Sequence, residues 1–166
     1  MPRLPHLMGY SRAQIRLHWL VAVLITLQYL LHEPIVAAWR AFRKGETLAF
    51  QPLVALHVAG GLAILALVLW RLWLRYRRGA PPPPEAEPAP LRLAARAAHV
   101  TLYALMVAMP LSGAAAWFGG IGAAAALHGW LRIVLLVLIG LHVLAVLAHQ
   151  LVFRTSLMQR MWRAEI

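Results

Sequence analysis

Four long apolar segments, separated by short polar or proline-rich stretches, make up most of this 166-residue chain. Each is close to the roughly 20 apolar residues with which a helix crosses the hydrocarbon core of a bilayer. The pattern therefore predicts an all-α fold, an integral membrane four-helix bundle that forms a single transmembrane domain over residues 1–166. The predicted spans cover residues 17–38, 53–74, 94–117 and 129–153.

Composition and charge support a membrane protein of defined orientation. The chain is 62% hydrophobic with a mean hydropathy of +0.70, far above a soluble domain. Its formal net charge of +11 comes mostly from arginines before the first span, between the second and third, and after the fourth. By the positive-inside rule, both termini are expected to be cytoplasmic. These basic residues flank spans and form no single stripe, so they fit anionic lipid headgroups and not nucleic acid.

A proline-rich stretch, residues 79–90, separates the second span from the third. Its sequence, GAPPPPEAEPAP, cannot remain helical and is expected to form a stiff, extended cytoplasmic connector. A proline-rich peptide ligand is the alternative interpretation. Pro110 is expected to kink the third span, and Gly119 and Gly120 to end it.

The N-terminal segment also has features of a secretory signal, because a basic start and an apolar run precede Val36-Ala37-Ala38. The run is long for a signal, and cleavage there would remove His18. We therefore interpret the segment as the first span.

Four histidines fall at two depths of the predicted bundle. His128 and His142 are 14 residues apart, nearly four helical turns, which places them on one face of the fourth span with about 21 Å of axial rise between them. With both termini inside, His18 enters the first span at its cytoplasmic end and His57 enters the second at its outer end. Depth therefore pairs His18 with His142 and His57 with His128, with the fourth helix common to both pairs.

Two histidines at each level favour haem over other metal centres. Zinc or copper needs three or four ligands at one level, and the absence of cysteine excludes thiolate ligation and covalent haem attachment. Each histidine taken alone is equally well explained as an interfacial residue with a satisfied hydrogen bond. The joint pattern predicts two non-covalent haem b groups with bis-histidine ligation.

Several other polar side chains are candidates for the same chemistry. Arg16, Arg71 and Arg75 are expected near the inner haem, where they pair with propionates, and Arg132 near the outer one; ordinary flanking charge explains the inner set equally well. His99 and His149 lie toward the cytoplasmic side, where a quinone reduced at the inner haem needs protons. Interfacial hydrogen bonding is the alternative for both.

Five motifs in order along the chain carry a resemblance to a known family. They are Tyr10-Ser-Arg-Ala-Gln-Ile-Arg-Leu-His18-Trp19, Leu56-His57-Val58-Ala-Gly60, Arg71-Leu-Trp-Leu-Arg75, His99-Val-Thr-Leu-Tyr103 with Met109-Pro110-Leu-Ser-Gly113, and Gly140-Leu-His142 followed by Ala148-His149. Together they resemble the bacterial cytochrome b561 family, four-helix dihaem b cytochromes of the inner membrane that exchange electrons with quinone. The resemblance implies that the axial ligands are His18, His57, His128 and His142.

Within that family the chain looks most similar to the superoxide oxidases, superoxide:ubiquinone oxidoreductases that collect superoxide at a positive outer face and reduce ubiquinone at the inner one. It departs from them in a shorter link between the third and fourth spans, which leaves only Arg40, Arg43, Lys44 and Arg132 as outer positive charge. Two alternatives stay open. One is a cytochrome b subunit for a hydrogenase or another membrane-anchored dehydrogenase, and the other is a helical membrane scaffold without a cofactor.

Overall fold

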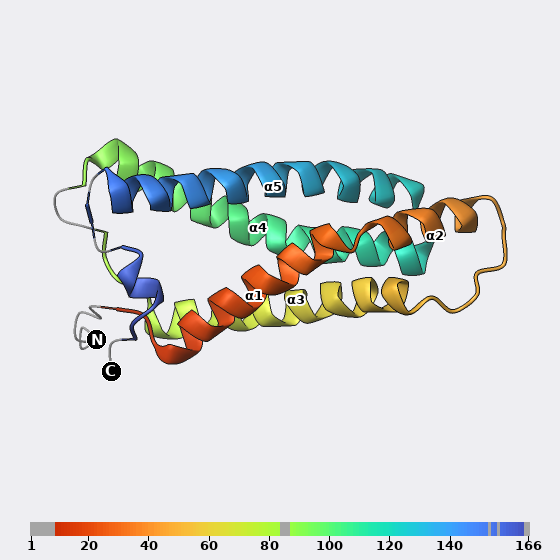
Figure 1. Ribbon diagram of the computed structural model, residues 1–166, viewed down its shortest axis with the longest axis horizontal. Helices are drawn as coiled ribbons and strands as arrows, with labels where there is room; N and C mark the ends of the chain where they lie inside the picture. The colour runs from red at the N-terminus through yellow and green to blue at the C-terminus, as the bar shows by residue number, and fades with distance from the viewer. Residues whose placement is uncertain (1–8, 84–86, 153, 156, 165–166) are drawn as a thin grey trace.

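The computed structural model describes residues 9–83, 87–152, 154–155 and 157–164 (Figure 1). This part of the chain is helical and contains no strand. Its elements are α1 (Arg12–Leu30), α2 (Glu33–Arg43), α3 (Pro52–Arg78), α4 (Ala89–Gly119), α5 (Gly122–Leu151) and the short 3-10 helix η1 (Gln159–Met161). Four of these helices, α1, α3, α4 and α5, are long and apolar enough to cross a membrane, as the sequence predicts.

The first predicted span, residues 17–38, differs from the structure because it is divided between two helices. Ser11 and Gln14 form a reciprocal capping box that starts α1 at Arg12, before the apolar run. The helix ends at Leu30, and α2 begins at Glu33 with a proline at its start. Pro34 has no backbone N–H, and its ring would collide with the carbonyl of Leu30 if α1 continued, so the chain breaks there.

The other helices are longer than the predicted spans, although α5 ends at Leu151, before the predicted end at residue 153. Helix α3 continues to Arg78 and is ended by Gly79, whose φ of 81° favours glycine. The connector is followed by α4 from Ala89, close to the predicted end of the connector at residue 90. Helix α4 ends at Gly119 as expected. Gly120, at φ 64°, and Ile121 form the two-residue link to α5.

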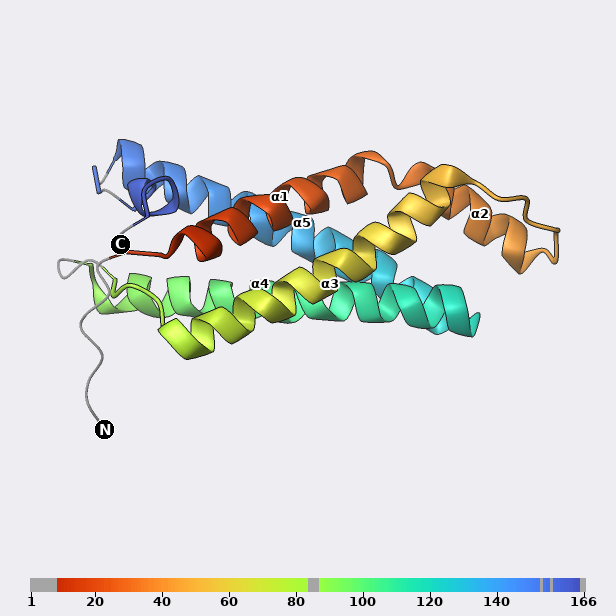
Figure 2. The same cartoon turned by 90° about the horizontal axis from the view of Figure 1, so that it is seen from below.

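The four long helices run along one axis (Figures 1 and 2). The described chain begins and ends at the same end of this bundle, and α2 with the loop that follows it lies at the opposite end. Buried aliphatic side chains join α1 to α3 through Val21, Ile25, Ile64 and Val68. A second cluster joins α4 to α5 through Leu102, Leu105 and Leu135.

The outside of the bundle is apolar. Large hydrophobic side chains of α5 such as Leu136, Val137 and Leu144 are more than half exposed. A soluble protein rarely exposes so continuous an apolar surface, whereas lipid tails cover it at no cost. The bundle therefore suits a bilayer, with its polar groups turned inward or gathered at the ends.

Candidate functional site

The ring of His128, on α5, is held in one orientation by α4. Its Nδ1 lies 2.9 Å from the carbonyl oxygen of Met109 and 3.2 Å from Oγ of Ser112. The Ser112 hydroxyl itself donates to the same carbonyl at 2.9 Å. A carbonyl can only accept, so Nδ1 carries the proton and Nε2 keeps a free lone pair. Hydrogen bonding of the second ring nitrogen is how proteins orient histidine ligands of metals.

The absence of a side chain at Gly113 lets α4 approach this ring. A Cβ atom built at Gly113 would lie 3.0 Å from Cε1 and 3.1 Å from Nδ1 of His128. Both distances are shorter than ordinary van der Waals contact. Ser112 and Gly113 therefore both position His128. Ser112 accepts a hydrogen bond from the ring and donates one to the Met109 carbonyl, and Gly113 leaves space for the ring.

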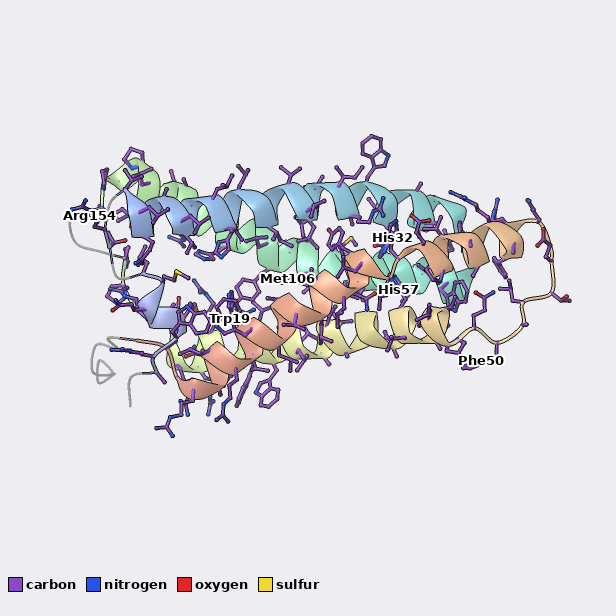
Figure 3. All side chains as sticks on the ribbon, viewed as in Figure 1. Trp19, His32, Phe50, His57, Met106 and Arg154 are labelled. Carbon is purple, nitrogen blue, oxygen red and sulfur yellow. The ribbon has the colours of Figure 1, made fainter. Side chains whose placement is uncertain are left out.

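His57, on α3, is a neighbour of His128. The two rings lie within range of each other's charge, and so does His32 at the start of α2, labelled with His57 in Figure 3. Nδ1 of His57 is buried without a hydrogen-bond partner among the described residues, and Oε1 of Gln28 is likewise buried without such a partner. The Gln28 amide lies directly over Gly60, less than one turn from His57, where a Cβ would collide with it.

Two buried polar atoms without partners are unusual, since burying such an atom costs about 1–3 kcal/mol. Their presence beside a histidine pair fits a polar or metal-containing group in this part of the bundle. His32 itself is engaged elsewhere. Its Nδ1 donates to the carbonyl of Tyr29 at 3.1 Å, and its Nε2 lies 3.2 Å from a carboxylate oxygen of Glu33.

At the other end of the bundle, three histidines gather around one arginine. The rings of His99 and His142 are 5.5 Å apart in an edge-to-face arrangement. His18 lies within range of the charge of both, and its Nδ1 accepts a hydrogen bond from Arg71 at 3.1 Å. The structure thus places His18 within range of the charge of His142, and His99 lies against His142.

The Arg71 contact has a consequence for metal ligation. When Nδ1 of His18 accepts from Arg71, the ring proton of the neutral imidazole is on Nε2. Ligation through Nε2 therefore requires the guanidinium to release His18 and turn to another acceptor. A propionate is an acceptor of the right charge, which is the partner that the sequence predicts for Arg71.

Arg71 shares its surroundings with Arg75. The two guanidinium groups lie 5.5 and 6.0 Å from the centroid of the Tyr103 ring, within cation-π range. The Tyr10 hydroxyl lies within range of the charge of Arg75, and burial raises the pKa of this hydroxyl although the charge of Arg75 opposes the shift. Arg16, predicted to join this set, is exposed on α1 and is outside the cluster.

The two predicted proton carriers lie in different places. While His99 contacts His142, His149 lies at the end of α5 against the connector, where its Nε2 is 3.4 Å from a carboxylate oxygen of Glu87. Nothing in the sequence pattern indicated Glu87 as its partner. The signal available was that two acidic residues, Glu85 and Glu87, stand shortly before α4 in a connector flanked by arginines.

Arg132 lies on α5, about one helical turn from His128. Its charge reaches both His128 and Tyr29. Its backbone carbonyl accepts a hydrogen bond of 2.6 Å from the Tyr29 hydroxyl, which ties α1 to α5 at the level of the His57 and His128 pair.

In the described part of the chain, no group of three or more histidine, cysteine, aspartate or glutamate side chains is arranged to hold a metal ion. Zinc-type coordination therefore lacks its ligands there. Two nitrogen donors at each of two levels suit a metal that brings its own equatorial ligands, which is the case for haem iron.

An all-helical membrane bundle with paired histidines inside defines the class of electron-transferring b-type cytochromes. The chain belongs to the family described as prokaryotic cytochrome b561, whose sequence profile matches residues 9–164. Membership confirms the resemblance found in the motifs. It identifies the chain as a multi-pass membrane electron-transfer protein and implies haem b as its cofactor.

Two of the curated relatives that the chain matches cover nearly all of it. It is 35% identical over 155 residues to "Cytochrome b562" of Cereibacter sphaeroides, a match that covers 93% of this chain and 96% of that protein. It is 30% identical over 177 aligned positions to "Probable superoxide oxidase CybB" of Yersinia pestis, covering 92% and 94%. A shorter match, 31% over 109 residues, is to "Cytochrome b561 homolog 1" of Escherichia coli, covering 64% and 57%.

Proposed function

We propose that the protein binds two haem b groups and moves electrons across the bacterial inner membrane, between a donor at the outer face and ubiquinone at the inner face. Both termini are cytoplasmic in this proposal, so α2 lies on the outer side. The observation that supports it is that His18 lies within range of the charge of His142, and His57 within range of the charge of His128, so that α5 contributes one histidine at each level. Arginines on both sides of the connector and near both ends of the chain support the orientation.

In the proposal His57 and His128 hold the outer haem, and His18 and His142 the inner one. A haem held by either pair of histidines would supply one-electron transfer. The protein sets the geometry: the hydrogen bonds of Met109 and Ser112 orient His128. About 21 Å of rise along α5 separates its two histidines.

We propose superoxide as the outer donor. One relative is named a probable superoxide oxidase, and Arg132 brings positive charge within range of His128. Superoxide is a small anion, so positive groups at the outer face raise its rate of encounter. The guanidinium group of Arg43, which lies 3.7 Å from the Cβ position of Gly122 at the start of α5, adds to that charge.

We propose the inner electron acceptor to be ubiquinone, bound beside His99, His149, Arg71 and Arg75. Guanidinium groups stabilise the negative charge that forms on a quinone oxygen, and histidines supply protons. The Arg71 and Arg75 cluster has no carboxylate partner among the described residues, so its charge is available to an anionic group. The alternative of a docking subunit for a dehydrogenase finds little outer surface between α4 and α5, whose link has two residues.

The first test is haem quantitation with a reduced-minus-oxidised spectrum of the purified protein. We expect two b haems per chain. His57→Ala or His128→Ala should remove the outer haem, and His18→Ala or His142→Ala the inner one, with different spectral components lost. His32→Ala is the matched control and should keep both.

Rapid mixing with superoxide and then with a ubiquinone analogue tests the two substrates. Superoxide should reduce the haems and the quinone should re-oxidise them. A colourless protein, or the loss of one shared haem in all four histidine variants, would contradict the dihaem assignment. Absence of reduction by superoxide, with haem content intact, would reject the donor alone.

A further inference from the structure

Glu87 is a sheltered carboxylate in an unusual position. Of the three acidic residues that the structure describes, Glu33 and Glu46 lie at the α2 end of the bundle, and only Glu87 lies at the end where the described chain begins and ends (Figure 1). Its side chain is 7% exposed although it belongs to the connector between α3 and α4. A sheltered carboxylate is costly unless it has a charged or hydrogen-bonding partner.

The partner of Glu87 is a histidine, although arginines are abundant at this end. Oε1 of Glu87 lies 3.4 Å from Nε2 of His149. On the other side of the ring, Oγ1 of Thr155 lies 3.4 Å from Nδ1. The same hydroxyl donates its hydrogen bond to the backbone carbonyl of His149 at 3.2 Å.

The protons in this set can be counted. Thr155 has one hydroxyl proton; when it is directed at the carbonyl of His149, Oγ1 accepts from the ring and Nδ1 carries a proton. If Nε2 were then unprotonated, its lone pair would face the carboxylate, which is repulsive in a sheltered place. A second proton between Nε2 and Glu87 removes that repulsion, whichever of the two atoms carries it.

We propose that Glu87 and His149 together store one transferable proton and deliver it to an oxygen of the quinone. The inference rests on the proposed function and adds Glu87 to it, as the residue that shares the stored proton with His149. His149 lies two helical turns beyond His142, about 10 Å along α5, so the store is close to the inner histidine pair.

The reaction balances without any further reagent. Reduction of a quinone to a quinol takes two electrons, which arrive through the haem side, and two protons. The pair gives one proton to a quinone oxygen and is left as a carboxylate and a neutral imidazole. It regains a proton from water at the edge of His149, whose side chain is 18% exposed, and the second quinone oxygen is protonated in the same way or directly from water.

A purely structural role is the competing explanation, because Glu87 also ties the connector to α5. Among the described residues, two other hydrogen bonds also hold the connector to the rest of the protein. Nε2 of Gln14 donates to the carbonyl of Gly79 at 3.2 Å, and Nη1 of Arg160 donates to the carbonyl of Pro82 at 2.7 Å. Removal of one of these hydrogen bonds weakens the attachment of the connector to the bundle without removing a proton carrier. It therefore provides a matched control.

The experiment uses the holoprotein with both haems, reduced without oxygen by dithionite and mixed with a short-chain ubiquinone analogue. The Glu87→Gln variant keeps a hydrogen-bond acceptor but cannot carry the proton. We expect full haem content and re-oxidation slowed about tenfold or more. Added formic acid buffer, a small proton carrier, should restore part of the rate. Arg160→Gln should re-oxidise at the wild-type rate.

Three results separate the explanations. Re-oxidation of Glu87→Gln at the wild-type rate overturns the proton store. An equal slowing in Arg160→Gln, with no recovery in formate, shows that Glu87 is a structural tie and also overturns it. Failure of the wild-type protein itself to re-oxidise with quinone rejects the proposed function instead. If Glu87→Gln loses haem, Thr155→Val replaces it, since without the hydroxyl Nδ1 need not be protonated and the same slowing is expected.

Discussion

The Gly113→Ala variant gives the sharpest test of how α4 positions His128. The added methyl carbon would lie 3.0 Å from Cε1 and 3.1 Å from Nδ1 of the ring. Optimal contact between carbon atoms is about 3.5–4.0 Å, so the ring or the helix must move by about 0.5–1 Å. The ring cannot move freely, because Nδ1 is bonded to the Met109 carbonyl at 2.9 Å.

The cost follows from three terms. Overpacking costs about 1–3 kcal/mol, and weakening the hydrogen bond to Met109 adds about 1 kcal/mol. Replacing glycine by alanine inside a helix returns about 0.5–1 kcal/mol. The net loss of about 1–3 kcal/mol falls on the orientation of His128 as a ligand, and it corresponds to about 5- to 150-fold weaker binding of the outer haem.

Haem titration of the purified apoprotein, followed by its absorbance spectrum, measures this affinity directly. Gly129→Ala is the matched control, since Gly129 is adjacent to His128 and its Cβ position has no atom within 4 Å. We expect the control to bind both haems as the wild type does. Equal outer-haem affinity in Gly113→Ala and Gly129→Ala would refute the argument that contact at Gly113 orients the ligand.

Three further predictions concern other parts of the site. Ser112→Ala should leave both haems bound but weaken haem binding at the outer site about tenfold, because one of the two hydrogen-bond partners of His128 is lost. The midpoint potential of the outer haem should also shift in a redox titration. An unchanged potential would show that Ser112 does not influence His128 as a ligand. Arg132→Glu should slow haem reduction by superoxide several-fold at low ionic strength, and the difference should shrink as salt screens the charge; a rate independent of the variant in stopped-flow mixing would indicate a different donor. Arg71→Ala should keep both haems and slow re-oxidation by ubiquinone analogues about tenfold or more, since a guanidinium no longer stabilises charge on the quinone; re-oxidation at the wild-type rate would mean that the quinone binds elsewhere.

The sequence predicted the long-range pattern of the fold better than its local breaks. Spans could be predicted because about 20 apolar residues in a row have few other structures available to them. The break after Leu30 was missed, although Glu33-Pro34 signals it, because the apolar run continues through Ala38 and hydropathy alone does not register a missing backbone N–H. The amphipathic helix α2 is the result of that break.

The histidines of the candidate site could be found from sequence because their spacing is helical and their depth follows from topology. Their partners could not be found in this way. Ser112 and Gly113 act on His128 across two helices, and Glu87 acts on His149 across the connector, so these contacts depend on the packing angle between elements and not on any spacing. The contact between His99 and His142 was likewise not predicted, since rotation of α4 about its axis sets the direction of the His99 side chain.

The proposed histidine pairs differ in how much of the chain separates their members. The ring of His128 is oriented by Met109, only 19 residues earlier and across the two-residue link between α4 and α5, so this geometry forms within one helical hairpin. His18 and His142, in contrast, are 124 residues apart and belong to the first and last membrane helices. During synthesis from the N-terminus, the inner pair therefore forms last, after α5 has entered the bilayer. A chain truncated between residues 129 and 141 retains both members of the outer pair and lacks His142, so loading of the inner haem reports that the chain has been inserted at least as far as His142.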